Sequence, residues 1–150
     1  MKDRLIGLDV GDKTIGVAVS DPLMITAQGV TTIERIGARK DCDKIIGYIK
    51  EYDAKTVVCG LPLMLDGTDS PQTEKVRAFA ELLQNKMRSS AIKAELVFMD
   101  ERFTTKIAES VMMETGMKRK ERKEFVDKQA AVIILQSYID KLHFKERNDG

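Results

Sequence analysis

Residues 4–20 read RLIGLDVGDKTIGVAVS, two short apolar runs on either side of a Gly-Asp-Lys turn. The runs at 4–10 and 15–20 are rich in Ile, Val and Leu, so we expect two strands joined as a β-hairpin. Side chains alternate between the faces of a strand, which places Asp9 on the same side as Leu5. The first strand therefore ends in a carboxylate on a face that also carries apolar side chains.

Outward from this hairpin, helical and extended patterns alternate along the chain. Apolar residues at steps of three and four predict helices before residue 56, at about 71–88, from Thr104 or Thr105 to Gly116, and at about 124–143. Further strands are expected near 30–33, at 56–59 and at 94–99. This order implies an α/β fold, with a mixed sheet of about five strands, the first three antiparallel, and helices on both faces. We expect residues 1–143 to form one domain and residues 144–150 a flexible C-terminal tail.

The composition of the chain excludes several classes of protein and of functional site. The 150 residues carry a formal net charge of +1, which does not suggest a protein that coats nucleic acid by bulk charge. No apolar stretch is long enough for a membrane span and no signal segment opens the chain, so we expect a cytoplasmic protein without a membrane partner. His143 is the only histidine, and the two cysteines, Cys42 and Cys59, lie far apart. Zinc sites and histidine-based triads are therefore not expected.

Three acidic residues stand at the ends or on the inner faces of expected elements. Asp9 ends the first strand, and Glu101 follows the segment Leu96 to Asp100. Asp127 opens an apolar helix and lies on the same face as Ala131 and Leu135. Carboxylates brought together raise one another's pKa unless a cation lies between them. If these three meet in space, we expect them to hold Mg²⁺ or Mn²⁺, a pattern typical of phosphoryl-transfer chemistry. For Asp127 alone, stabilisation of the helix N-terminus is the competing interpretation.

Basic residues near these acids could contact phosphates. Lys13 lies in the hairpin turn and Arg102 directly follows Glu101. The run before Asp127 adds five cations, Lys118, Arg119, Lys120, Arg122 and Lys123. It could be a phosphate-backbone clamp or simply a solvated linker between two helices. Two further acids lie near the three candidates. Asp100 precedes Glu101, and Glu124 could be a fourth ligand or a solvated first-turn residue.

Four motifs in order resemble the YqgF (RuvX) family. They are Gly7-Leu8-Asp9-Val10-Gly11 with Ile15 to Asp21, Gly60-Leu61-Pro62-Leu63 with Asp66-Gly67, Asp100 to Thr105, and Asp127-Lys128-Gln129-Ala130-Ala131. The resemblance implies an RNase H-like fold and a nuclease that matures the 5′ end of pre-16S ribosomal RNA. It also implies that Asp9, Glu101 and Asp127 are catalytic acids holding two divalent ions, which would activate water for attack on a phosphodiester. Asp100 would then lie just behind these ligands or on the opposite face of its strand.

Other functions fit the same motifs. The related resolvases suggest a nuclease acting on branched DNA, which would need a two-fold dimer to cut symmetrically, whereas a monomer would favour RNA processing, with possible association with the ribosome. A non-catalytic nucleic-acid-binding processing or transcription factor is a second alternative. The turn around Gly11 also resembles the start of actin-like kinases, although those need two lobes. Low aromatic content, 5%, favours recognition of nucleic acid by shape and backbone.

Overall fold

A computed structural model describes the backbone of residues 4–102 and 119–149, and the side chains of these ranges except at 119–128 and 147–149. The predicted hairpin is present as β1 (Arg4–Val10) and β2 (Thr14–Ser20), and β3 (Ala27–Glu34) continues the antiparallel meander. β4 (Ala54–Leu61) and β5 (Glu95–Asp100) then add parallel strands on the other side of β1. The sheet order is β3-β2-β1-β4-β5, which confirms the expected mixed sheet.

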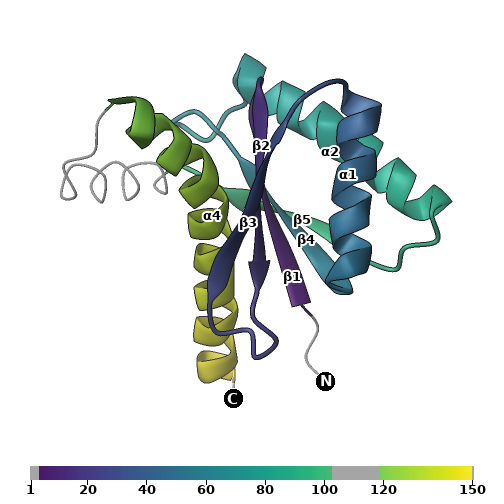
Figure 1. Ribbon diagram of the computed structural model, residues 1–150. Coiled ribbons are helices and arrows are strands. Elements are labelled where there is room, and N and C mark those ends of the chain that lie inside the picture. The colour runs from purple at the N-terminus through teal and green to yellow at the C-terminus, as the bar shows by residue number, and fades with distance from the viewer. Residues whose placement is uncertain (1–3, 103–118, 150) are drawn as a thin grey trace.

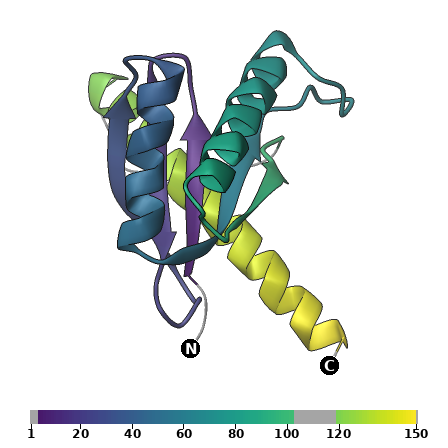
Figure 2. The ribbon, with the colours of Figure 1, turned by 90° about the vertical axis from the view of Figure 1, so that its right-hand side faces the viewer.

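Helices cover both faces of this sheet. α1 (Ala38–Glu51) and α2 (Pro71–Ser89) lie on one face, and α4 (Arg119–Asp149) lies on the other (Figures 1 and 2). The two faces have separate cores. Ile45, Phe79 and Leu83 belong to the larger core, while Ala131 and Leu135 of α4 belong to the smaller one. In the described part of the chain, no helix is long and apolar enough to cross a membrane.

α4 approaches β1 closely because β1 has a glycine at the contact. A Cβ atom added to Gly7 would lie 2.7 Å from Leu135 Cβ and 3.1 Å from the Ala131 carbonyl oxygen, closer than side chains normally approach. The glycine in the middle of a strand is explained by this close backbone approach. The contact also fixes which part of α4 lies beside β1.

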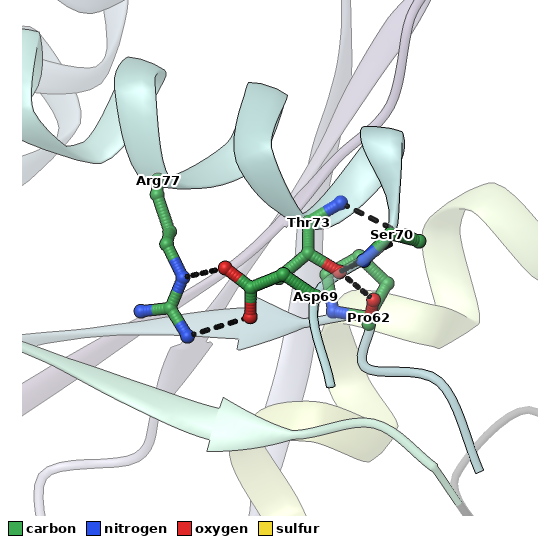
Figure 3. Close-up of polar contacts among 5 residues, drawn as sticks. All are labelled: Pro62, Asp69, Ser70, Thr73 and Arg77. Atoms are coloured by element: carbon green, nitrogen blue, oxygen red, sulfur yellow. Dashed lines mark hydrogen bonds and ion pairs between the residues drawn. The ribbon is translucent and has the colours of Figure 1, made fainter. Parts of the chain in front are cut away.

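The start of α2 is held by a group of polar contacts (Figure 3). The Ser70 hydroxyl accepts a hydrogen bond from the Thr73 N–H at 3.2 Å, and the Thr73 hydroxyl accepts one from the Ser70 N–H at 3.0 Å, a reciprocal cap. The Thr73 hydroxyl also donates to the Pro62 carbonyl oxygen. Arg77 pairs with Asp69 through two contacts of 2.9 and 3.1 Å. The segment between β4 and α2 is therefore tied to the helix at both of its ends.

Element boundaries differ from expectation in three places. β3 starts at Ala27, earlier than the region near residue 30 that the sequence indicated. α4 already includes Arg119, ahead of the expected start near residue 124, so the part of the basic run from Arg119 onward is helical and is no linker. α4 also continues to Asp149, through most of the segment expected as a tail. The helix predicted from Thr104 or Thr105 to Gly116 lies outside the described residues.

Candidate active site

Asp9 lies next to the C-terminal end of the central strand. It pairs with Gly16 of β2, and on its other side β1 runs parallel to β4, with Leu8 opposite Cys59. Leu5 and Gly7 pack against α4, so alternation along the strand places the half-buried Asp9 on the α4 face as well. The strand order reverses at β1, where open α/β sheets commonly bind ligands at the C-terminal strand ends.

Glu101 reaches the same face from the end of β5. Its backbone N–H donates to the Leu61 carbonyl oxygen at 3.1 Å, which continues the parallel pairing of β4 and β5 by one residue. A Cβ atom added to Gly60 would lie 2.8 Å from Glu101 Cδ and 2.5 Å from Ile134 Cδ1. The Glu101 carboxyl group therefore lies over Gly60, between β4 and α4.

The electrostatics show that the two carboxyl groups interact. Burial, followed by the negative charges of Asp9 and Asp100, raises the pKa of Glu101 from its usual 4.5 to about 8. Burial also raises the pKa of the Cys59 thiol, to which Glu101 and Asp9 contribute in that order. Such a site favours a proton or a cation. Carboxylate oxygens are the donors preferred by Mg²⁺ and Mn²⁺, so the chemistry of these two residues fits a hard divalent ion.

Asp127 lies within α4, four residues before Ala131, whose carbonyl oxygen is close to Gly7. Further along, His143 Nε2 lies 2.7 Å from the Met24 carbonyl oxygen, in the turn between β2 and β3. The helix thus runs from the Asp9 end of β1 towards its opposite end. Four residues of helix span about 6 Å, close to the advance from Gly7 to Asp9 along the strand, which places the backbone of Asp127 near the level of Asp9.

The Asp127 side chain is not among those described. Within the described residues, no three acidic, His or Cys side chains are grouped closely enough to hold a metal ion.

Asp100 and Arg102, the neighbours of Glu101 in the sequence, form an ion pair. Arg102 Nε and Nη2 lie 2.7 and 2.6 Å from Asp100 Oδ2, and the Arg102 N–H donates to Asp100 Oδ1 at 2.9 Å. These bonds and the positive charge hold the pKa of Asp100 below its usual value. Arg102 Nη1 also reaches the Leu65 carbonyl oxygen at 3.4 Å. Arg102 therefore joins the end of β5 to the segment after β4, and phosphate contact by Arg102 stays a prediction.

The structure describes the other candidate residues, the basic residues and Glu124, only in part. Lys13 is exposed in the β1–β2 turn, and its carbonyl oxygen accepts from the Arg35 N–H at 2.9 Å. The Gly11 N–H of the same turn donates to the Thr14 carbonyl oxygen at 2.9 Å, so this donor is already used within the turn. Arg119, Lys120, Arg122, Lys123 and Glu124 lie in the first turns of α4, where side chains are not described, and Lys118 lies outside the described backbone.

Sequence reasoning gave no role to Gly60, although its motif carried the family resemblance. A side chain at this position would come too close to both Ile134 and the Glu101 carboxyl group, so at least one of them would have to move. The available signal was a glycine at the end of an apolar strand, which often marks close approach of another group. The sequence did not show which group that was.

Comparison with known proteins identifies the family of this chain. The profile of a family described as "RuvX: Holliday junction resolvase" matches residues 3–141. A relative from Clostridium kluyveri is 45% identical over 139 residues, covering 93% of this chain and 98% of the relative. One from Clostridioides difficile is 49% identical over 137 residues, covering 91% and 94%. Both carry names that identify them as candidate pre-16S rRNA nucleases.

Solved structures agree on the fold. RuvC from T. thermophilus, in complex with a Holliday junction substrate, matches with a TM-score of 0.60 at 9% identity, covering 95% of this chain and 97% of RuvC. The fowlpox virus Holliday junction resolvase matches with a TM-score of 0.52 at 14% identity, covering 92% and 99%. These matches confirm the expected RNase H-like fold. With a family profile that covers nearly its whole length, the chain belongs to the RuvX family.

Proposed function

We propose that this protein is a divalent-metal-dependent nuclease that hydrolyses phosphodiester bonds in the maturation of the 5′ end of pre-16S ribosomal RNA. One observation carries the proposal: Asp9 and Glu101 meet on one face of the sheet, where burial and mutual repulsion leave Glu101 with a pKa of about 8. Two partly buried acids in contact are costly to the fold, and such groups are concentrated at functional sites.

Different residues of the chain would bind the metal ions and the phosphate backbone. Asp9, Glu101 and Asp127 would hold two Mg²⁺ or Mn²⁺ ions, and Lys13 with the basic residues at the start of α4 would bind the phosphate backbone. When bound, the ions would supply an activated water and charge stabilisation at the scissile phosphate. Asp100, neutralised by Arg102, would keep the backbone of Glu101 in place. Glu124 stands three residues before Asp127 in α4 and could serve as a further ligand.

The RNA substrate is supported by the names of relatives that are 45% and 49% identical over more than nine-tenths of this chain. Processing of ribosomal RNA would place the protein in the cytoplasm, in association with the maturing small ribosomal subunit. A monomer suffices for this role. A second candidate, cleavage of branched DNA, is favoured by the description of the family and would require a homodimer with two-fold symmetry.

The test compares cleavage of a pre-16S RNA fragment and of a four-way DNA junction, with Mg²⁺, with Mn²⁺ and with EDTA. Asp9→Asn removes one proposed ligand, and Asp12→Asn is its matched control, because Asp12 is exposed in the adjacent turn and pairs only loosely with Lys75 at 3.4 Å. We expect metal-dependent RNA cleavage by the wild type and by Asp12→Asn, and a loss of at least 100-fold in Asp9→Asn. Equal cleavage by all three proteins would refute the proposal, and cleavage of the junction alone would replace RNA by branched DNA.

A further inference from the structure

Arg35, the residue after β3, connects three elements around the β1–β2 turn. Its Nη1 donates to the Gly11 carbonyl oxygen at 2.9 Å, and its Nε lies 3.0 Å from Asp41 Oδ2 at the start of α1. Its guanidinium lies over the Phe79 ring of α2, 5.0 Å from the centroid. Its backbone N–H donates to the Lys13 carbonyl oxygen. One side chain and its own backbone thus hold both ends of the turn.

The partner of Arg35 is fixed as well. Asp41 is completely buried, and its second oxygen, Oδ1, accepts from the Ile36 N–H at 3.1 Å. The Asp41 N–H donates to the Gly37 carbonyl oxygen at 2.8 Å. Both carboxylate oxygens therefore have donors, Oδ2 from the Arg35 guanidinium and Oδ1 from the Ile36 N–H, so the carboxylate that holds Arg35 is itself fixed.

The turn that Arg35 holds follows Asp9 closely in the chain and contains Lys13. Gly11 is two residues after Asp9, and Lys13 is the exposed cation of the same turn. Within the turn, the Gly11 N–H donates to the Thr14 carbonyl oxygen, while the Gly11 carbonyl oxygen accepts from Arg35. A second contact, between Asp12 and Lys75 of α2, is exposed and long, at 3.4 Å. Arg35 is thus the main link between the turn and the helical layer opposite α4.

We propose that Arg35 is a positioning residue for the reaction at Asp9: by holding the Gly11 and Lys13 carbonyl oxygens, it sets the direction of the turn and so the geometry of Asp9 and Lys13. This inference rests on the proposed nuclease function. Catalytic groups must be held to within a fraction of an ångström, and a misplacement of about 1 Å can cost about 100-fold in rate. A lysine at this position would keep the charge but could not supply two directed bonds from one planar group.

A purely structural ion pair would behave differently. Replacing both members of a buried pair by apolar residues of similar volume often leaves stability unchanged or improves it. If Arg35 only neutralised Asp41, the double variant Arg35→Met/Asp41→Leu would keep full turnover. If Arg35 positions the turn, the double variant folds but is slow, because nothing then binds the Gly11 carbonyl oxygen.

The experiment measures kcat and KM on the pre-16S RNA fragment with Mn²⁺ for the wild type, Arg35→Lys and the double variant. Arg77→Met is the matched control: Arg77 also pairs with an aspartate, Asp69, and also lies over a ring, Phe98 at 5.6 Å, but it does not touch the turn. We expect kcat to fall about 10- to 100-fold in both Arg35 variants, with KM within about threefold, and Arg77→Met to match the wild type. A folded double variant with wild-type kcat would overturn the inference.

Two measurements keep this result separate from the nuclease function itself. Amide hydrogen exchange at residues 11–14 and calorimetric titration with Mn²⁺ need no substrate. We expect exchange at least tenfold faster and Mn²⁺ affinity at least threefold weaker in the double variant than in the wild type. If the wild type cleaves no nucleic acid, the proposed function fails, while these two changes would still support positioning by Arg35. Unchanged exchange and unchanged affinity would overturn it.

Discussion

Removal of the Glu101 charge should make the metal-free protein more stable at alkaline pH. Glu101 ionises at about pH 8 in the folded protein and near pH 4.5 when unfolded. Between these pH values the unfolded state releases a proton that the folded state keeps, so the free energy of unfolding falls as pH rises and stays low above pH 8. At about 1.36 kcal/mol per pH unit the whole difference is roughly 5 kcal/mol. Screening by water at a partly buried carboxyl group reduces this to about 2–4 kcal/mol.

Glu101→Gln removes this cost while keeping the shape of the side chain. At pH 8.5 in EDTA we expect the variant to be more stable than the wild type by about 2–4 kcal/mol, or roughly 5–15 °C in Tm for a chain of this size. At pH 4.5 the two proteins should be equally stable. Mn²⁺ at pH 8.5 should raise the Tm of the wild type and have little effect on the variant, because binding to the folded state is what stabilises.

The assay is thermal and urea unfolding, followed by circular dichroism, at pH 4.5 and 8.5, with and without Mn²⁺. Glu74→Gln is a suitable control for loss of one negative charge, because Glu74 is exposed in the first turn of α2. Equal stability of the wild type and Glu101→Gln at pH 8.5, or a less stable variant, would refute the placement of Glu101 in a buried acidic site.

Three further substitutions, with Gly47→Ala as a control for the first, test contacts of β1, β4 and α2. Gly7→Ala should lower the free energy of unfolding in urea by about 1–3 kcal/mol, because its Cβ would meet Leu135 at 2.7 Å; Gly47→Ala, where no atom lies within 4 Å, should raise it by about 0.5–1 kcal/mol. No loss in Gly7→Ala would contradict the close contact of α4. Gly60→Ala should reduce nuclease turnover at least tenfold by displacing the carboxyl group above it, and wild-type turnover would count against that contact. Ser70→Ala should cost about 1 kcal/mol in the same urea assay through loss of the helix cap, and no change would show that Thr73 caps α2 without it.

Local signals explain what the sequence could predict. The hairpin of β1 and β2 follows from two β-branched runs and a turn, and the start of α2 follows from Ser70-Pro71, because both depend on neighbouring residues. The acids at positions 9 and 101 were identified because each ends an apolar run. Strand alternation and the parallel arrangement of β1, β4 and β5 are enough to bring such ends to one edge of a sheet.

Other features depend on contacts that the sequence does not show. α4 already includes residues 119–123, ahead of the expected start, and no Gly or Pro interrupts residues 119–149. β3 is an edge strand whose exposed polar residues obscure the two-residue period, and its start was misplaced for that reason. The bond between Arg35 and Gly11 joins residues 24 positions apart and belongs to no motif. The role of Asp127 stays a prediction.

The central claim is that Asp9, Glu101 and Asp127 hold a divalent metal together. It is tested most directly by calorimetric titration of Mn²⁺ into the wild type, Asp9→Asn, Glu101→Gln, Asp127→Asn and the control Asp12→Asn at pH 8.5. We expect binding by the wild type and by Asp12→Asn, and affinity at least tenfold weaker in each of the other three variants. Wild-type affinity in Asp9→Asn and Glu101→Gln would contradict the claim, and wild-type affinity in Asp127→Asn alone would remove the third carboxylate from the site.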